Sequence, residues 1–125
     1  MATRFVATFE CSVSEKFKSM YLAAGNEDVI IIDSPVGMPA RAIKNRFTER
    51  FTSGEKISFH CRYRCLRTCN PATVPYCIAK ALGNASQGDI DNAVIFAGSN
   101  VSRVKKIVSV KELMDEIVKE ALREL

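Results

Sequence analysis

Apolar and polar positions alternate along the chain in ways that predict several short strands. Residues 4–9 alternate with a period of two, which predicts a strand with one buried face. Residues 28–33 contain the continuous apolar run Val29 to Ile32, typical of a strand that is covered on both faces in a parallel sheet. Residues 91–97 predict a turn followed by a strand, and residues 52–60 give a weaker pattern for a turn and a short strand.

Two helical stripes are expected in the first half of the chain. Ser12 and Glu15 have the spacing of a capping box, and the apolar positions that follow them up to Ala24 recur at helical spacing. A second helix is expected to begin at Pro39, a residue suited to the first helical turn, and to run to Phe51. Basic residues surround the apolar stripe of this second helix.

Two more helices are expected in the second half of the chain. Residues 76–87 carry apolar positions at helical spacing, although Gly83 weakens that prediction. Ser109 and Glu112 form a second capping box, and residues 110–125 keep one apolar face over their whole length. Strands that alternate with helices predict an α/β fold, in which a parallel or mixed sheet is covered by helices. Three clear strands are few for such a sheet.

Length and composition are those of one ordinary globular domain over residues 1–125. The chain is 47% hydrophobic and 26% charged, and its longest apolar run is far too short to cross a bilayer. The first residues lack the apolar segment of a signal peptide. We therefore expect a cytoplasmic protein that has no membrane partner and whose thiols are reduced.

The net charge of +4 is mild, and its excess lies in two arginine-rich segments, residues 41–50 and 62–67. Each segment contains a single aromatic residue, too few for a stacking surface for nucleic acid. A solvated basic face is the simplest interpretation, and a phosphate-bearing ligand is the alternative. We expect no nucleic-acid partner.

The segment CRYRCLRTCNPATVPYC, within a cysteine-rich loop at about residues 60–77, holds four of the five cysteines of the chain. Their spacing is C-x3-C-x3-C-x7-C, whereas zinc sites usually contain C-x2-C pairs and common iron–sulfur motifs also differ. If this segment were a helix, its first three cysteines would lie on one face and could pack in a core as small apolar side chains. Structural packing, metal binding and redox chemistry remain open. The candidate metal ligands are Cys61, Cys65, Cys69 and Cys77.

Four blocks of the sequence, in order, resemble the C-terminal third of the nitronate monooxygenase family, formerly called the 2-nitropropane dioxygenases. They are TRFVATFEC, DSPVGMPARAIKNRF, CLRTCNPATVPYCIAKAL and NAVIFAGSNVSRVKKIVSVKELMDEIV. The blocks cover nearly the whole chain. The family also includes flavin-dependent enoyl-acyl-carrier-protein reductases.

The resemblance implies an FMN-binding (β/α)8 TIM barrel, a fold that takes roughly 250 residues. We therefore expect this chain to be a partial, C-terminal segment of such a barrel, with few strands and several packed helices. The first half of the barrel and the catalytic histidine are expected upstream of Met1. His60, the sole histidine of the chain, does not match the catalytic position.

The resemblance also assigns two groups of site residues. One group matches the end of the family's phosphate-binding turn, whose backbone N–H groups hold the FMN phosphate. It consists of Met1, Ala2 and Thr3. The other group matches a turn near the substrate pocket, although an ordinary turn at a strand end would read the same way. It consists of Ala97, Gly98 and Ser99.

The function implied is oxidative denitrification of an alkyl nitronate by dioxygen, with FMN as cofactor. The alternatives are an enoyl-acyl-carrier-protein reductase that uses a nicotinamide cofactor, and an independent metal-binding module built on the cysteine loop. A non-catalytic remnant that self-associates through exposed strand edges is a further alternative. In each flavoenzyme case we expect weak flavin binding and little or no turnover by this chain alone.

Overall fold

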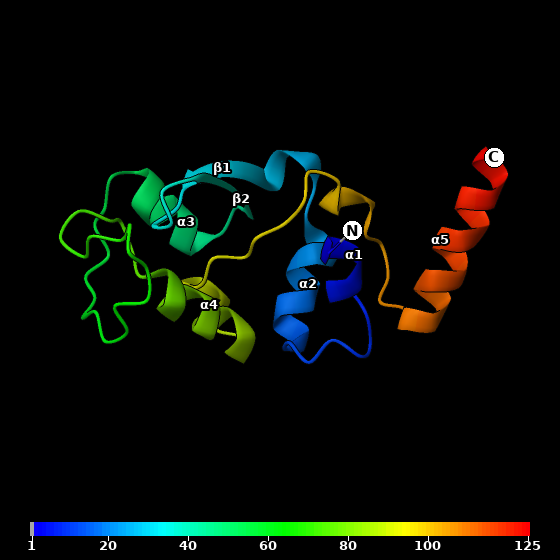
Figure 1. Ribbon diagram of the computed structural model, residues 1–125, viewed down its shortest axis with the longest axis horizontal. Coiled ribbons are helices and arrows are strands. Elements are labelled where there is room, and N and C mark those ends of the chain that lie inside the picture. The colour runs from blue at the N-terminus through cyan, green and yellow to red at the C-terminus, as the bar shows by residue number, and fades with distance from the viewer. Residues whose placement is uncertain (1) are drawn as a thin grey trace.

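A computed structural model describes residues 2–125, and Figure 1 shows an elongated arrangement of helices around one small sheet. The α-helices are α1 (Ala2–Val6), α2 (Glu15–Ala23), α3 (Arg46–Thr52), α4 (Ile78–Gln87) and α5 (Val110–Glu124). The strands are β1 (Val29–Asp33) and β2 (Pro39–Ile43). The 3-10 helices are η1 (Asn26–Asp28), η2 (Ile90–Asn92) and η3 (Val101–Arg103). Across residues 2–125, no helix is long and apolar enough to cross a membrane.

The sheet is an antiparallel hairpin. The strand expected over residues 28–33 is present as β1, but the expectation that it lies in a parallel sheet is wrong. β1 and β2 pair from Val29 opposite Ile43 to Asp33 opposite Pro39. One face of β1 is open, because Ile31 is 61% exposed while Ile32 is 2% exposed. The apolar run of β1 is therefore not covered on both faces.

The helix expected from Pro39 onward is split into a strand and a shorter helix. Residues 39–43 form β2, because its backbone pairs with β1 on one side and with an extended segment on the other. On that second side Ile43 N donates to Ile95 O at 2.9 Å, and Ala97 N donates to Arg41 O at 3.2 Å. The strand expected over residues 91–97 is thus an extended segment bound to the edge of β2.

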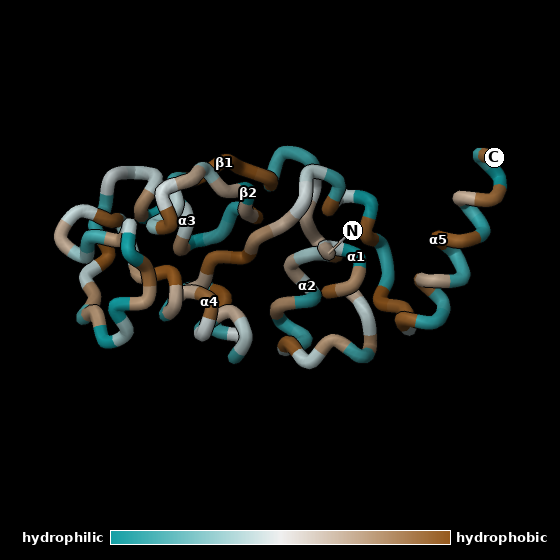
Figure 2. The backbone as a smooth tube through the Cα atoms, in the orientation of Figure 1, coloured by the Kyte–Doolittle hydropathy of each residue, from teal (hydrophilic) through white to brown (hydrophobic). Residues whose placement is uncertain are grey.

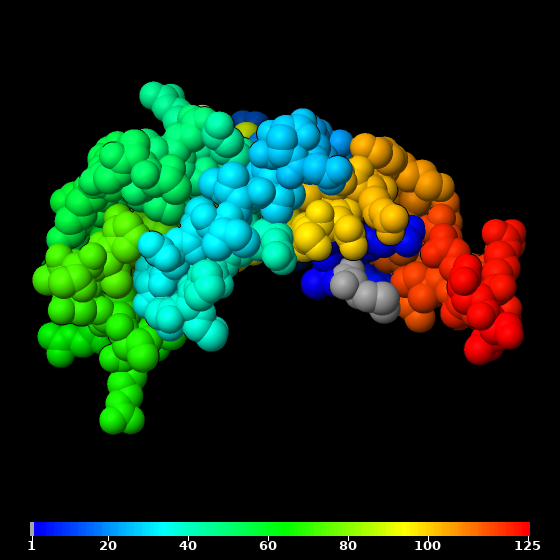
Figure 3. Space-filling view, turned by 90° about the horizontal axis from the view of Figure 1, so that it is seen from above, coloured from blue at the N-terminus to red at the C-terminus, as the bar shows by residue number. Residues whose placement is uncertain are grey.

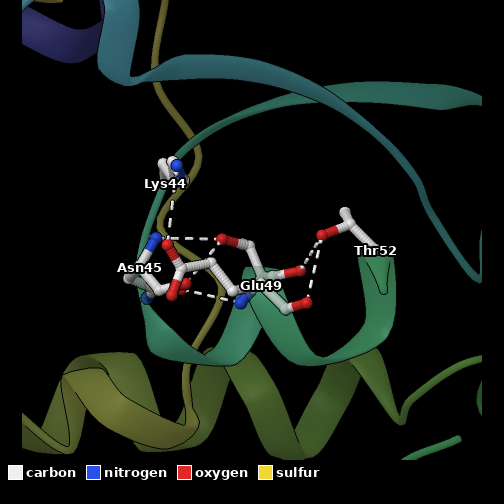
Figure 4. Close-up of polar contacts among 5 residues, drawn as sticks. Lys44, Asn45, Glu49 and Thr52 are labelled. Atoms are coloured by element: carbon white, nitrogen blue, oxygen red, sulfur yellow. Dashed lines mark hydrogen bonds and ion pairs between the residues drawn. The ribbon is translucent and has the colours of Figure 1, made fainter. Parts of the chain in front are cut away.

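The helix α3 begins only after β2 has ended, at an Asn cap. The Asn45 side chain accepts a hydrogen bond from Thr48 N at 2.9 Å, and Thr48 Oγ1 accepts one from Asn45 N at 2.9 Å. Figure 4 shows this cap together with Glu49, whose carboxylate lies 3.5 Å from Lys44 Nζ. A reciprocal cap of this kind satisfies backbone N–H groups that the first helical turn leaves without partners.

The strand expected over residues 4–9 is also wrong, since α1 occupies the first half of this segment. Its alternating pattern does not define a buried face, because Phe9 is 70% exposed. The Thr8 hydroxyl donates to Phe5 O at 2.7 Å, which closes a local turn after α1. The chain is extended only around Thr8, where it forms an isolated parallel bridge with Val108.

The helices expected over residues 76–87 and 110–125 are confirmed as α4 and α5. The helix α2 is confirmed as well, but its cap is Ser14, which accepts a hydrogen bond from Phe17 N at 3.2 Å, and not Ser12. The capping interaction of Ser109 is confirmed by the bond from Glu112 N at 3.1 Å. The apolar face of α5 is not buried along its length as expected.

That apolar face is buried only near the start of α5. Leu113 is 1% exposed, whereas Val118 and Leu122 are 52% and 66% exposed. In Figures 1 and 2, α5 projects from one end of the molecule with apolar positions on its free length, and Figure 3 shows it at the tip of an arched body. The self-association expected from the sequence stays a prediction.

Two buried clusters hold the fold together. The first lies between the hairpin and the helices α3 and α4, where the rings of Phe47, Phe51 and Tyr76 pack with centroids 4.6–5.6 Å apart. The second joins α2 to η3 through Tyr21, Ile95 and Val101. The segment over residues 93–97 contributes to both clusters and so ties the two halves of the molecule together.

Candidate functional site

An open groove of about 560 Å³ lies between the N-terminal helix, the turn before η3, and α5. Its walls combine small polar residues with charges of both signs. It is lined by Thr3, Arg4, Gly98, Ser99, Asn100, Arg103, Val104, Glu116 and Glu120. The groove therefore contains residues from both ends of the sequence.

A hydrogen bond joins the two segments at the base of this groove. Gly98 N donates to Thr3 Oγ1 at 2.8 Å. The space beside Gly98 is tight, since a Cβ atom at this position would lie 3.2 Å from the same oxygen. The turn that follows is closed by Val101 N, which donates to Gly98 O at 3.2 Å. Glycine at position 98 therefore lets the backbone of the turn approach the N-terminal helix closely.

Residues 96 and 97, which precede the turn, are fixed by hydrogen bonds to α2 and β2. The Tyr21 hydroxyl donates to Phe96 O at 2.5 Å, and burial raises the pKa of Tyr21 to about 12. Ala97 N is bonded to β2, as described above. The polar turn over residues 98–100 is thus exposed while the residues before it are fixed in the core. This is a suitable support for a binding turn, because the loop position is set by the scaffold.

The charges of the groove are partly compensated. Arg4 forms an ion pair with Glu116 across the groove. Within residues 2–125, neither Arg103 nor Glu120 takes part in an ion pair. Arg103 is exposed at the C-terminal end of η3, one turn away from Asn100. It offers a cation for an anionic ligand that enters beside the turn.

The structure brings some of the sequence-predicted site residues together. Thr3, Gly98 and Ser99 line the groove, so the two groups assigned separately from the sequence meet in one place. Ala2 is exposed and does not line it, and Met1 lies outside the described residues. Ala97 packs against the second buried cluster and does not line the groove.

Six groove residues were not predicted from the sequence: Arg4, Asn100, Arg103, Val104, Glu116 and Glu120. Asn100 and Arg103 lie in and after the turn in the stretch GSNVSR, which carries no motif that would single them out. Their position depends on η3, which brings Arg103 back toward Asn100 through the bond from Arg103 N to Asn100 O at 3.0 Å.

The cysteine loop lies at the opposite end of the molecule, in the green segment of Figure 1. It is not helical, so the single helical stripe of cysteines considered from the sequence does not form. The loop encloses an open pocket of about 610 Å³ that all four of its cysteines line. Burial raises the pKa of the Cys69 thiol, and the neighbouring thiols of Cys61, Cys65 and Cys77 raise it further. His60 lines this pocket too, far from the groove.

Comparison with solved structures shows the fold. FabK from Thermotoga maritima is similar with a TM-score of 0.73 and 22% identity, over 98% of this chain and 37% of that chain. The M276A mutant of FabK from the same organism gives a TM-score of 0.66 and 22% identity, over 94% and 31%. The chain thus spans about a third of the length of these structures. The expected fold class, an α/β segment of a TIM barrel, is confirmed.

Comparison of the sequence shows the family. No curated protein matches the chain. The sequence model described as nitronate monooxygenase matches residues 1–120, which is nearly all of the chain. This family is one of flavin-dependent oxidoreductases. The four sequence blocks predicted a match over nearly the whole chain, and the family model confirms it. The chain belongs to the nitronate monooxygenase family.

Proposed function

We propose that this chain contributes to an FMN-dependent oxidoreductase that oxidises an alkyl nitronate with dioxygen. The family match over residues 1–120 is the observation that supports this function. The proposed role of the chain is to bind the phosphate end of the flavin in the groove where Thr3 meets Gly98. The nitronate and dioxygen are the proposed small-molecule partners.

The residues of the groove suit the phosphate end of FMN. The turn over residues 98–100 is exposed, so a ligand can approach it from the groove. Ser99 and Asn100 supply polar groups, and Arg103 supplies a positive charge for the phosphate. The carboxylate of Glu116 would repel a phosphate, but its ion pair with Arg4 offsets that charge. Glu120 also lines the groove, and its carboxylate opposes the positive charge of Arg103 there.

When bound, the flavin would supply the redox chemistry by accepting electrons from the nitronate and returning them to dioxygen. The residues of this chain would hold and orient it. We assign no catalytic residue within residues 2–125, since His60, the sole histidine, lines the pocket of the cysteine loop and not the groove. We therefore expect little or no turnover by the chain alone.

The second candidate function is that of an enoyl-acyl-carrier-protein reductase, which would take hydride from a nicotinamide cofactor. The likeness to FabK favours it only at the level of fold, because the identity is 22%. Both candidates need a flavin phosphate site, so the groove residues have the same proposed role in each.

Comparison of FMN with riboflavin tests the proposed site, because riboflavin lacks the phosphate. We expect the purified chain to quench the fluorescence of FMN weakly and that of riboflavin more weakly still. Arg103→Gln should reduce FMN affinity roughly tenfold, since it removes a charge-assisted contact. Lys105→Gln is the matched control, because Lys105 is exposed but does not line the groove. Equal affinity for the two flavins would contradict the proposal.

Oxygen uptake tests the expected lack of turnover. The chain, supplied with FMN and an alkyl nitronate, should consume oxygen no faster than free FMN does. Rapid nitronate-dependent uptake with release of nitrite would show that the chain carries a complete catalytic site. Oxidation of a nicotinamide cofactor that depends on an enoyl thioester would instead support the second candidate.

A further inference from the structure

Four of the five cysteines gather around the pocket of the loop, although sixteen positions separate the first from the last. Cys61, Cys65, Cys69 and Cys77 all line it, and each is a free thiol. Cys65 is exposed and the other three are half-buried, so the sulfur atoms are not packed away in a core. Buried cysteines that serve only as small apolar side chains would have no reason to share an open pocket.

The loop that carries these thiols is held by turns and single hydrogen bonds. From Ser53 to Cys77 the chain forms neither helix nor strand, a length that is uncommon in a compact domain without a functional reason. Ile57 N donates to Pro75 O at 3.0 Å and Cys69 N donates to Leu66 O at 3.3 Å. Arg64 lies between the first two thiols with φ of +43°, a conformation that costs energy for a residue other than glycine.

The last thiol is not used to cap the helix that follows it. Cys77 is the N-cap residue of α4, and its side chain accepts no capping hydrogen bond. The sulfur of Cys77 is therefore available to bind another group.

The charge around the pocket complements a cluster of thiolates. The sequence from Lys56 to Gly88 contains no Asp or Glu. Five positive side chains fall in this stretch: Lys56, Arg62, Arg64, Arg67 and Lys80. Four thiolates around a divalent ion or an iron–sulfur core leave a net negative charge, which these basic residues would offset.

We propose that Cys61, Cys65, Cys69 and Cys77 together bind one thiolate-ligated metal centre, which orders the loop between α3 and α4. Four cysteine thiolates are the ligand set of both a tetrahedral zinc ion and an iron–sulfur cluster. Among residues 2–125, no three Cys, His, Asp or Glu side chains are already close enough to hold a metal ion. The loop would therefore close around the centre, and each thiol would lose its proton as its sulfur binds. This inference is independent of the flavin site at the other end of the molecule.

Metal analysis of the whole chain, expressed and purified without oxygen, tests the proposal. We expect either about one zinc ion per chain or about four iron atoms with a similar amount of sulfide and a broad visible absorbance. Replacement of any one of the four loop cysteines by Ser should lower the metal content at least several-fold. Addition of a chelator to the wild-type chain should speed amide hydrogen exchange over residues 57–77, while α5 should be unaffected.

Two control variants make the test specific. Cys11→Ser removes the fifth cysteine, which does not line the pocket, and should retain the metal. His60→Ala should also retain it, because the proposed ligands are the four thiols alone. Loss of metal in His60→Ala but not in one of the cysteine variants would overturn the assigned ligand set. Chains that contain no metal, or whose metal content is insensitive to all four cysteine variants, would overturn the site itself, as would loop cysteines recovered as disulfides.

Discussion

Gly98 N donates a hydrogen bond to Thr3 Oγ1, at 2.8 Å, across 95 positions of sequence. This bond brings the start of the chain to the turn that leads into η3, and the groove opens beside it. The family resemblance assigns the residues on the two sides of the bond to separate turns. Their contact is the structural reason why we propose that they form one binding site.

Gly98→Ala should destabilise the protein by about 1 kcal/mol, because its new Cβ would press on the Thr3 oxygen. That Cβ would lie 3.2 Å from the oxygen atom. Gly83→Ala is the matched control, since Gly83 lies in α4 with open space around its Cβ position. The control should raise the free energy of unfolding by roughly 0.5–1 kcal/mol. Denaturant unfolding of the two variants measures both effects, and equal stabilisation of both would contradict the tight contact.

Ser14→Ala should lower the free energy of unfolding by about 1 kcal/mol, because it removes the cap of α2. Ser12→Ala should leave stability nearly unchanged, since Ser12 is exposed and outside the helix. Thermal unfolding followed by far-ultraviolet circular dichroism compares the two. A larger loss of stability in Ser12→Ala than in Ser14→Ala would contradict this assignment and indicate that Ser12 is the cap, as the sequence pattern predicted.

The case of Ser12 and Ser14 shows what the sequence could predict and what it could not. Local patterns located α2, α4 and α5 well, because their apolar stripes and caps are local properties. They could not distinguish β2 from a helix, because the partners of residues 39–43 are β1 and a segment some 50 residues later. The prediction that both faces of β1 are buried was wrong for the same reason, since no local sequence pattern indicates that Ile31 is exposed.

The candidate groove was accessible to sequence reasoning only through the family resemblance. Thr3, Gly98 and Ser99 were identified in that way, and Ala97 was included because the family's turn begins with Ala-Gly. Ala97 packs into the core because the extended segment alternates its side chains between the two sides of the chain. Arg103 was not found, because its place beside the turn depends on the tertiary position of η3.

Tyr21→Phe and Tyr76→Phe should have opposite effects on stability. The Tyr21 hydroxyl bonds to Phe96 O, so Tyr21→Phe leaves that carbonyl without its partner and should cost about 1–2 kcal/mol. The Tyr76 hydroxyl is buried and, among residues 2–125, makes no hydrogen bond of normal geometry, although the Ser34 side chain lies near enough to oppose the rise of its pKa. Tyr76→Phe should therefore be neutral or stabilising. Denaturant unfolding near neutral pH measures both, and a large loss for Tyr76→Phe would show that its hydroxyl does have a partner.

Stability should fall in strong alkali as these tyrosines ionise. Burial raises the pKa of both Tyr21 and Tyr76 to about 12, above the ordinary value of 10.0. Their contribution is fully present below pH 10, where both states are protonated, and is lost as the pH rises through 12, because the unfolded chain releases its protons first. Each should remove roughly 2 kcal/mol by pH 12.

Unfolding free energies measured at intervals between pH 9 and pH 12 test this dependence. The double variant Tyr21→Phe, Tyr76→Phe should show a clearly shallower decline than the wild type over the same range. Tyr63 is 67% exposed, so Tyr63→Phe serves as the control and should leave the slope unchanged. Identical slopes for the wild type and the double variant would contradict the role of the two buried tyrosines.

The most direct test of the flavin site is an NMR titration of the isotope-labelled chain with FMN, which detects weak binding residue by residue. We predict that the backbone amide signals of Gly98, Ser99 and Asn100 shift together with that of Thr3 as FMN is added. Riboflavin should cause smaller shifts at the same amides. Shifts confined to the cysteine loop, or none at any FMN concentration, would contradict the proposed flavin-binding groove.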